Sequence, residues 1–381
     1  MDPIAEEEWS SLLDRVSEAI DLEATALLAG ALVRRRRIQS AGDLLRLALV
    51  YGPGGLSLRD TAVLAGLEGL GDLSKTALLY RLRDAGDWLE EIASALLAQR
   101  WRSLGGETRT WLGRELRLVD ASSITAPGQA SDWRLHAVYD LGRQRFDRLE
   151  LTDKHQAEAL ERTPTGPGQL LVADRVHARP DGLSHVLASG GDFLVRLGSK
   201  SLRLRHPDGK AFDLEAALRR SQAEGGLDLT VEILHARRKA WTPLSARLVI
   251  LPKPPPAAQA SRGKALRASQ RGGHRNDPLS LEAAEHLMLI TSIPADQASP
   301  QQLMEVYRLR WQIELAFKRL KSLLHIDRLP AKEPRLAKAW LCAHLIAALL
   351  IEDIAPQLRA LSPSVPGHPD DRSGTLPMAR H

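Results

Sequence analysis

The sequence predicts an α/β protein in which helices precede a mixed sheet. With 381 residues and 44% hydrophobic content, the chain is long enough for two or three domains with a sizeable core. Helical patterns fill the first hundred residues, and strand patterns begin near residue 115. The expected parts are an all-helical N-terminal domain (1–110), a core in two segments (111–201 and 280–352), a β-rich, basic insertion (202–279) and a disordered tail (353–381).

Composition excludes several classes of protein. The single cysteine, Cys342, rules out an intramolecular disulfide framework and a cysteine-rich zinc site. The N-terminus lacks the basic and apolar regions of a signal peptide, and the most apolar run, residues 339–351, is too short to cross a bilayer. We therefore expect a cytoplasmic protein without a membrane partner, in which residues 339–351 form a buried helix.

Charge is distributed unevenly along the chain. The net charge is +5, but residues 1–30 contain eight acids and only one arginine, so the remaining chain carries a net charge of +12. An excess of this kind fits a polyanionic partner.

Two short helices are predicted within residues 57–89. Ser57 and Ser74 are candidate N-caps, and glycines separate the two helices. This pattern resembles a helix-turn-helix, whose second helix would offer Lys75 and Arg81 to DNA. An ordinary helical bundle explains the same pattern equally well. The four arginines at 34–37 would either contact phosphates or be solvated.

The middle of the chain has the strand order of a known sheet. Residues 115–120, 133–141 and 145–153 read as three meandering strands, followed by a short helical piece (154–162) and a buried strand (169–175). This is the opening order of an RNase H-like sheet. A helix at 181–189 and a strand at 192–197 come next.

The insertion differs from the core in composition. It contains two plausible strands, 227–234 and 245–252, and then a stretch rich in cations, proline and glycine at 253–278. This stretch is predicted to be a mobile basic loop, with a partly helical segment as the alternative. The second segment of the predicted core then contains a strand at 287–294. One helix is then predicted to begin with Ser299 as its N-cap and Pro300 in its first turn.

That helix carries an unusual line of polar residues. At about 100° per residue, Tyr307, Arg310, Glu314 and Lys321 fall within a wedge of roughly 60°. A second, apolar stripe is suited to burial and consists of Val306, Ile313, Phe317, Leu320 and Leu324. Taken alone, the polar line could be a surface face with an Arg310–Glu314 pair worth only about 0.3–0.5 kcal/mol.

Two strands end in acids, Asp120 and Asp174. If these strands pair, their carboxylates would lie close together and could share Mg²⁺ or Mn²⁺ with Glu314. Two such ions support phosphoryl transfer. The alternative is that each strand-end aspartate caps a loop, and Asp140 and Asp153 are rivals for the same role.

These residues resemble the bacterial insertion-sequence DDE transposases of the IS-four family. Tyr307, Arg310, Glu314 and Lys321 match the family signature Tyr-x2-Arg-x3-Glu-x6-Lys at all four positions. Asp120-Ala121-Ser122-Ser123 corresponds to the first-acid motif, and Asp174-Arg175-Val176-His177 to the second, although Val176-His177 replaces the usual Gly-Tyr. The similarity covers roughly residues 110–350.

The resemblance implies a function and a site. The family cuts DNA at terminal inverted repeats with Mg²⁺ and joins the 3′ ends to target DNA, usually as a homodimer in a synaptic complex. Asp120, Asp174 and Glu314 would hold two Mg²⁺ or Mn²⁺ ions, while Tyr307, Arg310, Lys321 and Arg175 would contact DNA. An RNase H-like nuclease without strand transfer, or a catalytically inactive DNA-binding regulator, remain alternatives. The expected location is the cytoplasm, in association with the nucleoid.

Overall fold

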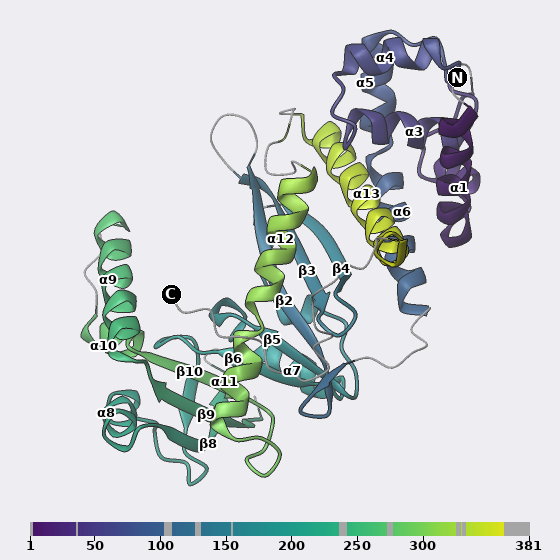
Figure 1. Ribbon diagram of the computed structural model, residues 1–381. Coiled ribbons are helices and arrows are strands. Elements are labelled where there is room, and N and C mark those ends of the chain that lie inside the picture. Colours follow the sequence, from purple (N-terminus) through teal and green to yellow (C-terminus); the bar gives the residue numbers. More distant parts are fainter. Residues whose placement is uncertain are drawn as a thin grey trace.

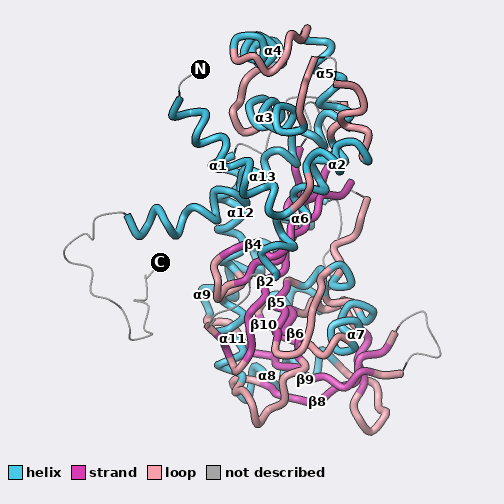
Figure 2. The backbone as a smooth tube through the Cα atoms, turned by 90° about the vertical axis from the view of Figure 1, so that its right-hand side faces the viewer, coloured by secondary structure: helices cyan, strands magenta, loops and turns pink. Residues whose placement is uncertain are grey.

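A continuous sheet of ten strands runs through the molecule, with the N-terminal helices at one end (Figure 1). The computed structural model describes residues 3–35, 37–102, 109–125, 131–153, 155–235, 242–272, 277–324, 329 and 333–361. Seen from the side, the strands form a single band below the N-terminal helices (Figure 2). The predicted α/β class is thus confirmed.

Six helices make up the N-terminal region: α1 (Pro3–Ala19), α2 (Leu22–Leu28), α3 (Ala41–Tyr51), α4 (Leu58–Leu67), α5 (Lys75–Asp84) and α6 (Gly86–Arg102). The hydroxyls of Ser57 and Ser74 accept hydrogen bonds from backbone N–H groups in the first turns of α4 and α5, so both predicted N-caps are confirmed. The helix-turn-helix role of this pair stays a prediction.

Gly71, in the connection between α4 and α5, has a backbone conformation that requires glycine. Its φ is 151°, and a Cβ atom there would lie 2.2 Å from the carbonyl oxygen of Arg37. Gly69, in the same connection, also has a positive φ of 70°, but open space surrounds its Cα. The turn thus fits against the arginine-rich segment only because residue 71 has no side chain.

Gly71→Ala is expected to lower the free energy of unfolding by about 3 kcal/mol, because backbone strain and a steric clash add together. Gly69→Ala is the matched control and should cost only about 1 kcal/mol, since it adds strain alone. Urea denaturation of both variants measures the difference. Equal costs would mean that the approach of Gly71 to Arg37 does not constrain the turn.

The long helix α13 (Pro334–Leu361) packs against α3, α5 and α6, so the C-terminal segment joins the N-terminal helices. The predicted buried helix at 339–351 is confirmed. One window, Pro334–Asp353, is long and apolar enough by composition to cross a membrane, but 72% of it is buried inside the protein. Residues 353–361, which were assigned to the tail, are helical instead, and residues 362–381 lie outside the described part.

The central strands are β2 (Arg114–Thr125), β3 (Ser131–Asp140), β4 (Arg145–Asp153), β5 (Gln169–Ala173) and β6 (Asp192–Arg196). Their order across the sheet is β4-β3-β2-β5-β6, with β2, β3 and β4 antiparallel and β5 parallel to both β2 and β6. A short strand, β1 (Thr110–Trp111), pairs with β2, and α7 (Pro180–Ala188) connects β5 to β6. The predicted strands and the helix after β5 are confirmed.

The short helix predicted at 154–162 is wrong apart from its last turn. Only the 3₁₀ turn η1 (Leu160–Arg162) is helical, and Lys154 is outside the described residues. Side chains take the place of helical hydrogen bonds here, since Asp153 accepts from the backbone N–H groups of His155 and Gln156, and Arg162 donates to Gln156 and to the carbonyl of Ala157.

The insertion extends the central sheet. Strand β10 (His286–Thr291) pairs with β6, and it is followed outward by β9 (Leu244–Pro252), β8 (Leu227–Leu234) and β7 (Arg203–Arg205), all antiparallel. Two helices, α8 (Leu214–Glu224) and α10 (Pro278–Ala284), accompany these strands. The predicted strands at 227–234, 245–252 and 287–294 are therefore confirmed.

The predicted basic loop at 253–278 is largely wrong. Residues Pro255–Gly272 form an 18-residue helix, α9. Proline is tolerated in the first turn of a helix because the first N–H groups have no partner within the helix. Alanine, glutamine, lysine and arginine, which follow the prolines, all favour helix.

The helix predicted from Ser299 is interrupted. It consists of α11 (Pro300–Arg308) and α12 (Trp311–Leu324), with Ser299 and Gln302 forming a capping box. Between the two helices, the N–H groups of Leu309, Arg310, Gln312 and Ile313 bond to carbonyls three residues earlier, as in a 3₁₀ helix. The apolar stripe holds as far as it is described, since Val306, Ile313 and Phe317 are buried.

Candidate active site

Two adjacent strands bring the candidate acids side by side. The predicted end of the first strand at Asp120 is wrong, because β2 continues to Thr125, whereas β5 ends at Ala173, just before Asp174. The last parallel pair between β2 and β5 is Val119 with Ala173, so the next residues on the two strands are Asp120 and Asp174. Parallel strands present their carboxyl ends at the same edge of a sheet, and neighbouring strands lie about 4.8 Å apart. Pairing of the two strands, on which the predicted site depends, is therefore confirmed.

The junction between α11 and α12 contacts these two aspartates and contains Arg310. Its Nη1 donates to Asp120 Oδ2 at 3.3 Å, and its Nη2 forms an ion pair with Glu314 Oε1. One guanidinium thus connects an acid of the sheet to an acid of the helix. The Arg310 side chain is only 16% exposed, whereas that of Glu314 is 56% exposed and lies at the rim.

Tyr307 links the same junction to the second strand. Its hydroxyl donates to Asp174 Oδ1 at 3.3 Å. Burial, together with the negative charge of Asp174, raises the pKa of Tyr307 to about 12. The phenol therefore keeps its proton at neutral pH and remains a donor to this carboxylate. Lys321 belongs to α12, but its side chain is outside the described part.

The two aspartates differ in their electrostatic environment. Burial raises the pKa of Asp120, and the nearby charges of Glu158 and Glu314 add to this, while the Ala121 N–H and Arg310 oppose it. Burial acts in the same direction on Asp174, but the N–H of Arg175 and the charges of Arg196, Arg310 and Arg175 outweigh it and lower its pKa. The carboxyl group of Asp120 is thus the harder of the two to ionise.

Arg310 is held firmly in its charged form. Burial disfavours its charge, but Tyr307, Glu314 and Asp120 together raise the pKa of the guanidinium above its usual value. A permanent cation thus lies among acids that would otherwise repel one another.

The donor set fits a hard divalent cation, although the side chains are arranged around Arg310. Asp120, Asp174 and Glu314 supply only carboxylate oxygens, which Mg²⁺ and Mn²⁺ prefer. Within the described ranges, no group of three His, Cys, Asp or Glu side chains is close enough to hold a metal ion as it stands. The positive charge of Arg310 lies between Asp120 and Glu314. A cation bound by these acids would therefore have to displace the Arg310 side chain.

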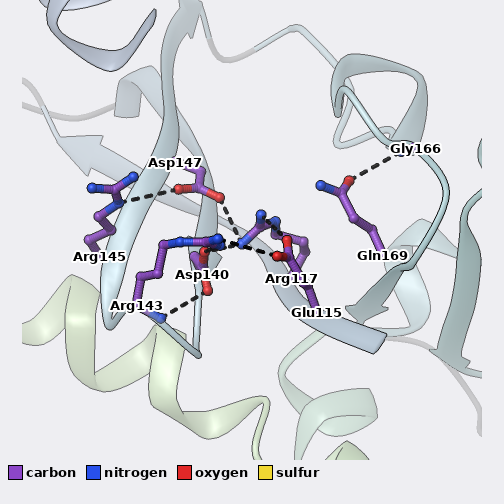
Figure 3. Close-up of polar contacts among 8 residues, drawn as sticks. All are labelled: Glu115, Arg117, Asp140, Arg143, Arg145, Asp147, Gly166 and Gln169. Atoms are coloured by element: carbon purple, nitrogen blue, oxygen red, sulfur yellow. Dashed lines mark hydrogen bonds and ion pairs between the residues drawn. The ribbon is translucent and has the colours of Figure 1, made fainter. Parts of the chain in front are cut away.

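The rival acids have other roles. Asp140 is fully buried and forms ion pairs with Arg117 and Arg143, in a network that also includes Glu115 and Asp147 (Figure 3). Asp153 accepts hydrogen bonds from two backbone N–H groups in the turn after β4. Asp140 therefore has a structural role in the ion-pair network, and Asp153 caps a loop.

The predicted N-terminal DNA contacts lie away from the carboxylates, on α5. Lys75 is exposed in the first turn of this helix, whereas Arg81 is half-buried and donates to the carbonyl oxygen of Arg34 at 2.9 Å. Arg81 thus helps to fix the arginine-rich segment. Arg175 is exposed next to Asp174, in the 3₁₀ turn η2 (Arg175–His177).

Sequence reasoning missed two charged neighbours of the site, Arg196 and Glu158. Arg196 ends β6, and its Nη1 lies 3.9 Å from Asp174 Oδ1. Because Arg196 lies at the carboxyl end of the next predicted strand, its sequence position could have identified it as a neighbour of the site. Glu158 lies near Asp120 and 3.7 Å from Arg134. No pattern indicated it, because its segment was predicted to be helical.

His177, in the family's usual Tyr position, is buried beside the second acid. Burial lowers its pKa to about 4, so the ring is neutral at physiological pH. Its Nε2 lies 4.0 Å from Glu158 Oε2. The Val176-His177 departure is accommodated by the 3₁₀ turn η2, which keeps Asp174 at the strand end.

Comparison with known proteins gives consistent matches. Residues 111–350 match the family described as "Transposase DDE domain". The chain is 44% identical over 349 residues to the putative transposase InsL for insertion sequence element IS186A of Escherichia coli K12, covering 91% of this chain and 93% of the relative. It is also 43% identical over 350 residues to the transposase for insertion sequence element IS421 of Escherichia coli, with the same coverage of both chains.

Proposed function

Since this chain belongs to the insertion-sequence DDE transposases and is an enzyme that acts on DNA, we propose that Asp120, Asp174 and Glu314 are its catalytic carboxylates. They would cut DNA at the inverted repeats of the element and join the 3′ ends to target DNA. The observation that carries this proposal is the convergence of two aspartates from adjacent strands with Glu314 through Tyr307 and Arg310. Family members generally depend on a divalent metal, and two Mg²⁺ or Mn²⁺ ions are the proposed complement.

The metal, when bound by the three carboxylates, would activate the attacking oxygen and stabilise the leaving oxygen of an in-line phosphoryl transfer. Arg310 forms ion pairs with Asp120 and Glu314, which limits the repulsion between these two acids. When DNA enters, the same guanidinium is suited to bind a phosphate, because its planar donors match two phosphate oxygens. Tyr307 orients Asp174 through its hydroxyl.

The fold supports an RNase H-like core for this reaction. The support is the spatial order β4-β3-β2-β5-β6, in which three antiparallel strands are followed by two parallel ones. The division into an N-terminal DNA-binding domain, core and insertion remains part of the proposal. So do a homodimer in a synaptic complex, DNA contacts by Lys75, Arg81, Arg175 and Lys321, and a location in the cytoplasm at the nucleoid.

The proposal is tested by incubating the full chain with Mg²⁺ and DNA that contains the ends of its own element. Cleaved and joined products are expected. Cleavage without joining would favour an RNase H-like nuclease, and binding without cleavage would favour an inactive regulator.

Tyr307→Phe tests the link between the helix junction and Asp174. Removing the hydroxyl takes away the donor that links Asp174 to the helix junction, so we expect cleavage to fall about 10–100-fold, as for other partners of metal ligands. The Mg²⁺ concentration that gives half-maximal cleavage should rise, whereas DNA affinity should not change.

Tyr51→Phe is the matched control, because Tyr51 is also buried but belongs to the N-terminal helices. It should leave the Mg²⁺ dependence unchanged. If Tyr307→Phe cut DNA with the wild-type Mg²⁺ dependence, the proposed orienting role of the phenol would be wrong.

A further inference from the structure

Helix α9 is the most strongly basic exposed helix of the insertion. Its 18 residues, Pro255–Gly272, include four cations and no acid. At 1.5 Å per residue it is about 27 Å long. Most of its side chains are exposed, and its main contact is with α10. Figure 1 shows it projecting from the side of the molecule that lies far from the N-terminal helices.

One face of α9 is fixed to the rest of the protein. Arg262 Nη1 forms an ion pair with Glu285 Oε1 at 2.6 Å. At the base of the helix, Lys253 Nζ donates to Ser261 Oγ at 2.9 Å and to the carbonyl oxygen of Ala284 at 2.7 Å. These contacts hold the helix by its N-terminal half.

The other cations face away from this attachment. At about 100° per residue, Lys264, Arg267 and Arg271 fall within a wedge of roughly 60°, which lies opposite Arg262. All three are exposed, and among the residues that the structure describes none of them has an ion pair. We call these three residues the outer stripe. Charges of the same sign this close together repel one another, and nothing in the protein's fold requires them.

We propose that the outer stripe binds the phosphate backbone of duplex DNA, independently of its sequence. The three cations span about 10 Å along the helix axis, which corresponds to about three steps of 3.4 Å between successive phosphates of one strand. Duplex DNA is the partner that the charge fits, since an acid-free helix face offers no complement to a mixed protein surface.

The position of α9 relative to the carboxylates strengthens this assignment, which rests on the proposed function. Lys253, at the base of α9, has its pKa lowered by burial and by the positive charge of Arg196. Arg196 in turn lies 3.9 Å from Asp174. The helix therefore starts within electrostatic reach of the candidate site, and DNA bound there can continue along α9.

The test measures the affinity of the full chain for duplex DNA at several salt concentrations, without Mg²⁺. The variant is Lys264→Gln/Arg267→Gln/Arg271→Gln. Each phosphate contact contributes about 0.9 to the slope of log affinity against log salt, so this variant should reduce the slope by about 2.7. The loss should be the same on element ends and on unrelated DNA, and it should exceed about tenfold in 0.1 M salt.

A matched control removes three cations from the same insertion that are already paired with acids. These are Lys210, Arg219 and Arg220, whose partners are Asp208, Glu215 and Glu224. The triple glutamine variant has the same change in net charge, but its slope should fall by less than about one unit. Exchanging lysine and arginine within the outer stripe, which keeps the charge, should preserve the wild-type slope.

A wild-type slope in the outer-stripe variant would overturn the inference, and so would an equal loss in the control variant. Either result is independent of the proposed function, because cleavage is assayed separately with Mg²⁺. If the wild-type protein failed to cut DNA, the proposed function would be contradicted. The inference would still stand if the outer-stripe variant showed the reduced slope of log affinity against log salt.

Discussion

Asp120→Asn and Glu314→Gln are each expected to lower Mg²⁺-dependent cleavage of an element end by at least about a thousandfold. Loss of a partner that only orients a metal ligand costs about 10–100-fold, and loss of a ligand itself should cost more. Asp174→Asn should behave in the same way. DNA affinity should be retained or increased, because each change removes a negative charge that repels phosphate. Single-turnover cleavage and gel-shift assays measure the two effects separately.

The control for these variants is Asp153→Asn, which makes the same chemical change at another strand end. Asp153 only accepts hydrogen bonds from a turn, so its replacement should cost about 1 kcal/mol of stability and leave cleavage within a few-fold of wild type. If either Asp120→Asn or Glu314→Gln cut DNA as well as Asp153→Asn does, the two acids would not belong to one catalytic site.

Arg117→Met is expected to lower the free energy of unfolding by about 3–5 kcal/mol, the usual cost of removing one partner from a buried ion pair. The Arg117 side chain is 1% exposed and forms ion pairs with Glu115, Asp140 and Asp147 (Figure 3). Without it, Asp140 and Asp147 would remain buried with less positive charge nearby. Burial already raises the pKa of Asp147 to about 6 with Arg117 present.

Arg148→Met is the control for the buried network. Arg148 lies on β4 next to Asp147, but its side chain is 36% exposed and pairs with Glu150 at 3.1 Å. A surface pair of this kind contributes about 0–1 kcal/mol. Urea unfolding of both variants gives the comparison. If Arg117→Met cost no more than Arg148→Met, the buried ion pairs would not stabilise this end of the sheet.

The sequence was informative where local patterns decide the structure. Alternating residues predicted β3 and β4, a continuous apolar run predicted β5, and serine caps predicted the starts of α4, α5 and α11. Because Asp120 and Asp174 each follow a predicted strand, their adjacency required only that the two strands be parallel neighbours. Helical periodicity then placed Tyr307, Arg310 and Glu314 on one side of the chain.

The remaining features depend on contacts between distant segments. The interruption at Arg310 has no proline or glycine to mark it, and it coincides with ion pairs to Asp120 and Glu314. Glu158 comes near Asp120 through a segment held by side-chain hydrogen bonds, which periodicity does not report. Helix α9 was missed because its prolines and glycines suggested a loop, whereas they lie mainly at its two ends.

If Asp120, Asp174 and Glu314 hold metal at a single point, Fe²⁺-directed cleavage of the protein should reveal all three segments at once. Iron bound in place of Mg²⁺ reduces added hydrogen peroxide to hydroxyl radicals, which cut the backbone next to the iron ligands. With DNA present, we expect cuts near residues 120, 174 and 314 together, and excess Mg²⁺ should suppress all three in parallel. Cuts at only one of these segments, or cuts that Mg²⁺ suppresses separately, would contradict a shared site.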